Sequence, residues 1–112
     1  AQKHPVLGRE LTSYFVENRF KDRLAAKLPR GVQVANKIGT WPGTVNDVAV
    51  VACENVSYVI AVMSRSIAPT IESGQRALQD ISLAVYRHIT SRLPKDVKTA
   101  SVARRAFGLV GQ

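Results

Sequence analysis

The sequence predicts an α+β domain, in which a three-stranded antiparallel sheet is flanked by an N-terminal helix and a long C-terminal helix. Three segments have the character of strands: residues 32–38 alternate between apolar and polar side chains, 45–51 are apolar except at Asn46 and Asp47, and 57–64 are rich in β-branched and aromatic residues. The links between them are short, so consecutive strands must run antiparallel. Residues 71–90 have the periodicity of an amphipathic helix.

The N-terminal region predicts a lead-in followed by a short helix. Residues 1–9 contain a proline and a glycine and show no period, and the helix is expected from Glu10 to about Asn18. Its inward-facing side chains are expected to be Leu11, Tyr14 and Phe15. Residues 18–28 keep the helical phase, so the helix either extends or breaks there. Pro29 and Gly31 end it in either case.

The strands are expected at Val32–Ile38, Val45–Ala52 and Ser57–Ser64. Glu54–Asn55 is typical of a tight hairpin turn between the second and third strands. The turn between the first two strands is marked by Gly39, Pro42 and Gly43.

The C-terminal helix is expected over Ile71–Thr90, after a loop at Arg65–Thr70 whose last residue caps the first turn. Its apolar stripe, which should lie on the sheet, consists of Ile71, Ala77, Leu78, Ile81, Ala84, Val85, His88 and Ile89. Pro94 ends the pattern, and Ala100–Leu109 form either a weak amphipathic turn or a tail.

Length and composition limit the number of domains and the classes of protein that the chain can belong to. A chain of 112 residues makes at most one domain, and no apolar run approaches the roughly 20 residues of a membrane helix. The chain starts at Ala1 without a signal-peptide pattern, so we expect a mature product or a processed or expressed piece. A single cysteine, Cys53, excludes an internal disulfide and is expected to be a buried, unreactive thiol.

The net charge of +8 permits binding to nucleic acid or to anionic surfaces. Much of the excess lies in residues 87–105, where six basic residues face Asp96 alone, and a solvated basic tail is the simpler interpretation. Aromatic residues are few and are not interleaved with the basic ones, so nucleic-acid binding is disfavoured. No histidine, cysteine or carboxylate cluster has the spacing of a metal site, and no cofactor is expected.

One extended motif resembles a known family. Leu28-Pro29-Arg30-Gly31 leads into a strand that ends Lys37-Ile38-Gly39-Thr40, and the next strand begins Asn46-Asp47-Val48-Ala49. This arrangement resembles the Lys-Thr-Gly region of the class A β-lactamases and of the penicillin-recognising serine hydrolases. The resemblance covers residues 10–90, so 1–112 would be a single partial domain, similar to the C-terminal part of the β-lactamase/transpeptidase-like fold, followed by a basic tail at 91–112. It also implies a helix break after Asn18.

The resemblance implies a serine hydrolase associated with antibiotic resistance, acting on β-lactams or on peptidoglycan-type D-alanyl peptides. The family uses Ser-x-x-Lys, Ser-Asp-Asn and a water-positioning glutamate besides Lys-Thr-Gly. This chain contains no Ser-x-x-Lys, no Ser-x-Asn and no Glu-x-x-Leu-Asn. We therefore expect no catalytic residue in the chain and no activity of the chain alone. The family is usually exported, which implies an extracytoplasmic location, but the chain itself carries no export signal.

The substrate-binding residues implied by the resemblance are Lys37, Gly39, Thr40 and Trp41. Lys37 matches the lysine that faces the active site and helps to hold the substrate carboxylate, and Thr40 matches a hydroxyl residue that shares this contact. Ile38 stands where the family has threonine or serine. Because neighbouring residues of a strand point to opposite faces, Ile38 can serve as a packing residue without displacing Lys37.

Three functions remain open at the level of sequence: the C-terminal portion of a β-lactamase-like hydrolase, a non-catalytic binding or structural homologue, and a small basic nucleic-acid-binding module. In the family fold the third strand and one face of the sheet are covered by parts that are missing here. We therefore expect an exposed strand edge and an exposed apolar face. Self-association, or pairing with a missing N-terminal half, should follow.

Overall fold

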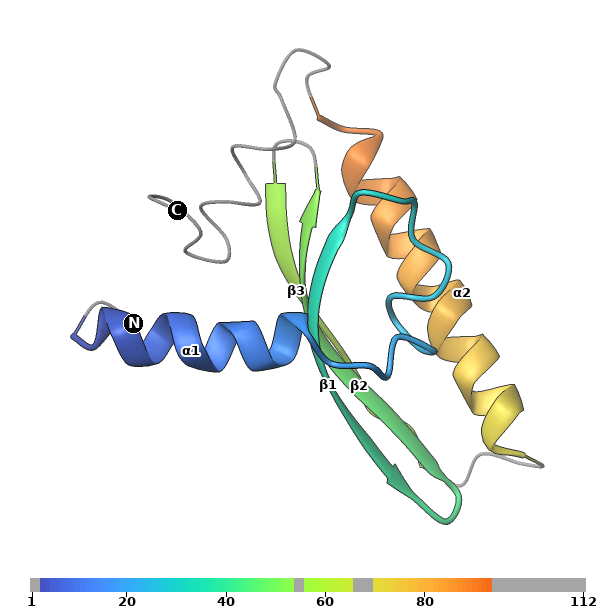
Figure 1. The fold of residues 1–112 in the computed structure, drawn as a ribbon. Coiled ribbons are helices and arrows are strands. Elements are labelled where there is room, and N and C mark those ends of the chain that lie inside the picture. Colours follow the sequence, from blue (N-terminus) through green and yellow to red (C-terminus); the bar gives the residue numbers. More distant parts are fainter. Residues whose placement is uncertain (1–2, 54–55, 66–69, 94–112) are drawn as a thin grey trace.

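The fold is seen in a computed structural model that describes residues 3–53, 56–65 and 70–93. In chain order its elements are α1 (Pro5–Val16), β1 (Gln33–Trp41), β2 (Thr44–Cys53), β3 (Val56–Val62) and α2 (Ile71–Thr90). The three strands form one antiparallel sheet in the order β1-β2-β3 (Figure 1). The predicted α+β fold with a helix on either side of the strands in sequence is confirmed.

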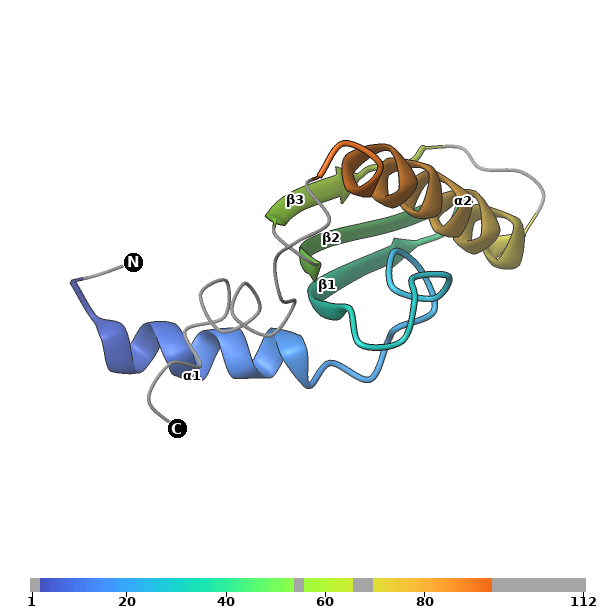
Figure 2. The same ribbon diagram turned by 90° about the horizontal axis from the view of Figure 1, so that it is seen from above.

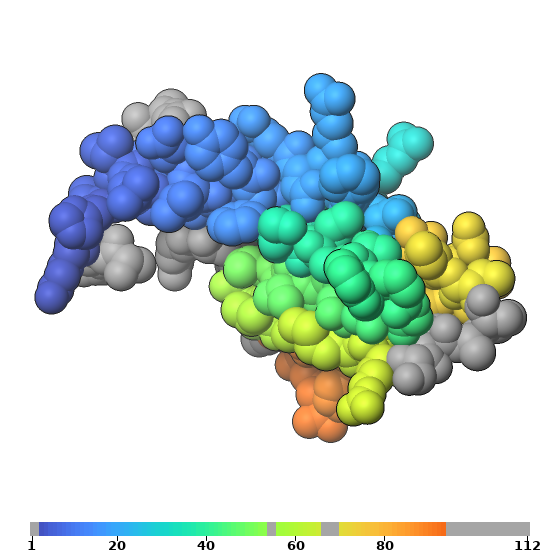
Figure 3. Space-filling model, turned by 90° about the horizontal axis from the view of Figure 1, so that it is seen from below, coloured from blue at the N-terminus to red at the C-terminus, as the bar shows by residue number. Residues whose placement is uncertain are grey.

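The sheet is covered unequally on its two faces. Helix α2 lies across one face, and the irregular segment 17–32 lies beside it next to β1 (Figure 2). Helix α1 touches the other face only near its C-terminal end, where Val16 packs against the buried Ala35 and Ala52. The space-filling view shows the rest of α1, in blue, reaching away from the strands (Figure 3).

The hairpin of β1 and β2 is longer than predicted. Pairing continues through Gly39, opposite Asn46, to Trp41, opposite Thr44. Gly39 was expected in the turn but lies in the strand, because Pro42–Gly43 alone closes the hairpin and Gly43 supplies the positive φ of 74°.

Helix α1 differs from the prediction in its start and in its burial. It begins at Pro5 instead of Glu10, because proline at the first helical position has its φ already set and loses no hydrogen bond there. Its end at Val16 confirms the break. The inward-facing set Leu11, Tyr14 and Phe15 was wrong: these side chains are 49%, 62% and 40% exposed, because the described part of the chain presents no surface to cover them.

Helix α2 has its predicted bounds and its predicted cap, since the Thr70 hydroxyl accepts a hydrogen bond from Ser73 N at 3.2 Å. The predicted apolar stripe is only partly right. The buried line is Gly74, Leu78 and Ser82, whereas Ile71 and Ile81 are 45% and 44% exposed. Other stripe members that prove to be exposed are Ala77, Ala84 and His88.

The buried line of α2 faces the sheet and the segment 17–32. The Ser82 hydroxyl donates to Leu24 O at 2.6 Å, so the helix and the segment pack closely. Leu24 itself is fully buried. The core cluster between the sheet, this segment and α2 comprises Leu24, Val34, Val45, Ala49, Val51, Ile60 and Leu78.

The opposite face and the edge of β3 leave apolar side chains in solvent, as expected. Val59 and Met63 are 70% and 64% exposed. Cys53 is buried, as predicted. Among the described residues, no helix is both long enough and apolar enough to cross a membrane. The predicted turn Glu54–Asn55 and the tail from residue 94 onward lie outside the described residues.

The position of Leu24 predicts which side chain holds segment 17–32 in place. Leu24→Ala should lower the free energy of unfolding by about 2–5 kcal/mol, because it removes a fully buried side chain from the core cluster. Leu11→Ala, the same change on the exposed face of α1, should cost less than about 1 kcal/mol. Urea denaturation followed by circular dichroism measures both, and equal losses would contradict the packing described.

Candidate functional site

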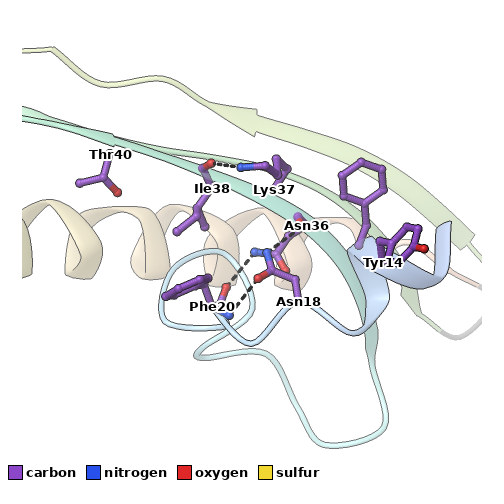
Figure 4. Close-up of a pocket in the computed structure, with 8 residues that line it drawn as sticks. Tyr14, Asn18, Phe20, Asn36, Lys37, Ile38 and Thr40 are labelled. Atoms are coloured by element: carbon purple, nitrogen blue, oxygen red, sulfur yellow. Dashed lines mark hydrogen bonds between the residues drawn. The ribbon is translucent and has the colours of Figure 1, made fainter. Parts of the chain in front are cut away.

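A pocket of about 610 Å³ lies at the free edge of β1 (Figure 4). Its walls come from the end of α1, from the segment that follows it and from β1. The lining residues are Tyr14, Phe15, Asn18, Phe20, Asn36, Lys37, Ile38 and Thr40. Two of the four predicted substrate-binding residues, Lys37 and Thr40, therefore line one pocket.

Lys37 and Ile38 leave the strand on opposite sides, as the pleat requires (Figure 4). Ile38 is half-buried, and Lys37 is exposed. The Lys37 ammonium donates to the Ile38 carbonyl at 2.8 Å. An ammonium group has three donors, so this bond leaves two of them for a ligand or for water.

Thr40 is held by a guanidinium group beneath the hairpin. Arg23 Nη2 donates to Thr40 Oγ1 at 2.6 Å. Because arginine only donates, the hydroxyl acts as the acceptor here, and its own proton stays available for another acceptor, such as a carboxylate oxygen.

Arg23 is itself buried, with 3% of its surface exposed. Its Nη1 atom donates to Gly39 O at 3.1 Å and to Asn46 O at 2.9 Å, and so it joins β1 and β2 near the end of the hairpin. Its Nε has no hydrogen-bond partner among the described residues, and Asp22 Oδ1 lies 3.7 Å away. A buried cation thus stands directly behind Thr40.

A buried carboxylate and a buried amide lie beside this cation, under the sheet. Asp47 and Asn36 are 0% and 1% exposed. The Asn36 amide donates to both oxygens of Asp47, at 3.1 and 3.3 Å, and Leu24 N donates to Asp47 Oδ2 at 3.2 Å. Burial raises the pKa of the Asp47 carboxyl above its usual value, while the hydrogen bonds and the nearby cations oppose that shift.

Lys21 completes this network from the side of the pocket. Its ammonium donates to Val34 O and to Asn36 Oδ1, each at 2.7 Å. Burial lowers the pKa of Lys21, and the charge of Asp47 opposes that shift. Lys21, Arg23 and Lys37 together place three cations along one edge of the sheet.

The other two predicted residues lie outside the lining of the pocket. Trp41 stands at the end of β1 and is 75% exposed. A Cβ atom at Gly39 would meet only Asn46 atoms, at 3.7 and 3.9 Å, so the protein itself does not require a glycine there. Their roles in substrate binding stay predictions.

Sequence reasoning missed Lys21, Arg23 and Asn36 as parts of the site. A signal was present for Asn36 and Asp47, since each is a polar residue at an inward-facing position of its strand. Lys21 and Arg23 carried no such signal, because their partners in β1 and β2 lie 13 to 23 positions away in sequence. Within the described residues, no group of three or more metal-ligating side chains comes together.

Comparison with known proteins identifies the family of the chain. Residues 5–89 match the Beta-lactamase2 family, described as the beta-lactamase enzyme family. Because the match covers most of the chain, the protein belongs to the β-lactamase family. No curated protein sequence matches the chain.

Solved structures show the same fold. A β-lactamase from Sphaerobacter thermophilus is similar with a TM-score of 0.68 and 22% identity, over 82% of this chain and 38% of that one. A class A β-lactamase from Bacteroides cellulosilyticus gives 0.65 and 30% over 72% and 32%, and the TLA-1 extended-spectrum β-lactamase gives 0.65 and 23% over 70% and 32%. The chain thus spans about a third of the length of the structures that it matches.

The raised pKa of Asp47 predicts how Asp47→Asn changes stability with pH. The folded state holds the carboxyl proton more tightly than the unfolded state, so the stabilising effect of protonation is complete below the unfolded pKa of about 4 and is lost as pH rises through the folded value. As the pH is lowered from about 7 to about 4, the free energy of unfolding of wild type should therefore rise relative to that of the variant.

Denaturant titrations of both proteins at several pH values measure this difference. Asp80→Asn, at an exposed carboxylate paired with Lys27, removes the same charge from the surface and serves as the control. A difference that shifts in favour of Asp47→Asn on acidification would show a carboxyl with a lowered pKa and would contradict the burial argument.

Proposed function

We propose that this chain is the C-terminal portion of a class A β-lactamase-like serine hydrolase. In this proposal the free edge of β1 contributes Lys37 and Thr40 to a site for a β-lactam or a D-alanyl peptide. The observation that carries it is their position in one open pocket, with the cation of Arg23 behind Thr40.

The electrostatics of the pocket support an anionic ligand. Lys37 is exposed with two unused donors, the Thr40 hydroxyl keeps its proton for an acceptor, and Arg23 adds positive charge in a buried position. Donors arranged before the ligand arrives are what recognition of a carboxylate requires. β-Lactams and D-alanyl peptides both carry such a carboxylate.

The nucleophile in this proposal comes from outside these residues, because the sequence contains no Ser-x-x-Lys. The apolar surfaces support a partner that brings it. The exposed side of α1, with Leu7 and Leu11, and the exposed side of the sheet, with Val59 and Met63, would be covered by a missing N-terminal half, or by a second copy in its absence.

A second candidate is a non-catalytic homologue that kept the fold for binding or for structure. Ile38 supports this candidate, since a half-buried isoleucine lines the pocket where the family has a hydroxyl residue. Acylation of the protein by penicillin separates the two functions.

The first test incubates the natural gene product, with any co-purifying chain, with a penicillin and measures intact mass. An adduct on a serine outside the 112 residues is expected, and none on the isolated chain. Lys37→Ala should slow the acylation by about 100-fold, because it removes a charge that stabilises the bound anion. Lys27→Ala removes an equal charge far from the pocket and should leave the rate unchanged.

Two results would count against the hydrolase. A complete, folded protein that forms no adduct would favour the non-catalytic homologue, and Ile38→Thr would then be the first reversion to make. Equal acylation rates for Lys37→Ala and wild type would show that Lys37 takes no part in the site, and they would not bear on the assignment to the family.

The exposed edge of β3 predicts self-association of the isolated chain. Analytical ultracentrifugation should show dimers or larger species at micromolar concentration. Val59→Lys places a charge on that strand and should shift the chain toward monomer, since charged side chains discourage pairing of strand edges. A folded, monodisperse wild-type monomer would contradict the prediction.

A further inference from the structure

Helix α1 forms one wall of the pocket but makes little apolar contact with the other described residues. None of its residues is buried, and its C-terminal Val16 provides its contact with the small cluster around Ala35. Tyr14 and Phe15, which line the pocket, are 62% and 40% exposed. Something other than burial must fix the distance between this helix and β1.

The Lys21 side chain supplies that connection. Its ammonium donates to Phe15 O at 3.3 Å, to Val34 O at 2.7 Å and to Asn36 Oδ1 at 2.7 Å. The three donors of the ammonium group thus meet three acceptors. Phe15 O belongs to the last turn of α1, whose carbonyl groups have no partner within the helix, and Val34 O is a backbone group of β1.

Two amides extend the same connection along the pocket. The Asn18 amide donates to Asn36 O at 2.9 Å, and the Asn36 amide donates to Phe20 O at 3.0 Å (Figure 4). The orientation of the Asn36 amide is fixed by chemistry, because Lys21 can only donate and the Asp47 carboxylate can only accept. The Asn36 side chain thus bridges the Lys21 ammonium and the Asp47 carboxylate.

We propose that Lys21 is a positioning residue of the pocket: it fixes the end of α1 to the edge of β1 and so sets the place of the aromatic wall, Tyr14 and Phe15, relative to Lys37. The part of this inference that concerns substrate rests on the proposed function. The part that concerns the placement of α1 does not. Lys21 touches no reacting atom in this scheme and acts through the helix that it holds.

The placement of α1 is tested with spin labels in the natural gene product, at Glu10→Cys on α1 and Ser57→Cys on β3, in a background without other cysteines. Both sites are exposed. Wild type should give one narrow distance peak. Lys21→Met, which leaves three acceptors unpaired, should lose that peak, and Lys21→Arg, which keeps charge and donors, should restore it. Lys27→Met should match wild type.

An unchanged peak in Lys21→Met would overturn the proposal, as would a failure of Lys21→Arg to do better than Lys21→Met. If Lys21→Met does not fold, Lys21→Gln takes its place. It keeps an amide donor without the charge, and it should give a broadened peak. A peak identical to that of wild type in this variant would also overturn the proposal.

The effect on substrate is measured by acylation with benzylpenicillin at a series of concentrations. Lys21→Met should weaken the apparent affinity about tenfold and change the rate at saturation by less than about threefold, since it shifts a wall of the pocket and removes no reacting group. A loss confined to the saturating rate would overturn the positioning role toward substrate. If wild type is not acylated, the proposed function fails, and the spin-label distances alone decide the role of Lys21.

Discussion

The structure depends on one buried carboxylate. Asp47 lies on the middle strand, β2, and is fully shielded from water, and its oxygens accept hydrogen bonds from Leu24 N and from the Asn36 amide. A buried charge is tolerated only when it is hydrogen-bonded and when opposite charges lie near. The irregular segment 17–32 meets this requirement, because it lies on the strands and supplies one donor, Leu24 N, together with the cations Lys21 and Arg23.

That requirement joins three parts of the molecule. Segment 17–32 carries Arg23, which reaches the end of the β1–β2 hairpin, and Lys21, which reaches the end of α1. On its other side the same segment is bound to α2, where Ser82 donates to Leu24 O and Gln79 donates to Asp22 O. The long helix and the edge of β1 do not touch at the pocket, but both are placed by one segment between them.

The sequence predicts most of the fold but less of the burial. Periodicity places the three strands and both ends of α2 because those patterns are set by neighbours in sequence. It places Leu78 of α2 in the core correctly, but it also assigns the exposed Ile81 to the core and treats the apolar side of α1 as buried. An apolar side chain indicates that it is to be buried, but it does not indicate which surface buries it. Ile81 and Leu11 are exposed because the described residues supply no surface against them.

The residues of the candidate site also divide into those that the sequence predicts and those that only the fold reveals. A motif of adjacent residues marks Lys37 and Thr40, whereas Arg23 is recognised only when the fold brings it under the hairpin. That contact also bears on Ile38. Thr40 and Ile38 share one side of β1 and Lys37 lies on the other, so an isoleucine can pack in the pocket while a hydroxyl two residues later is held by a cation. Loss of one hydroxyl at position 38 thus leaves the charge and the remaining hydroxyl of the edge in place.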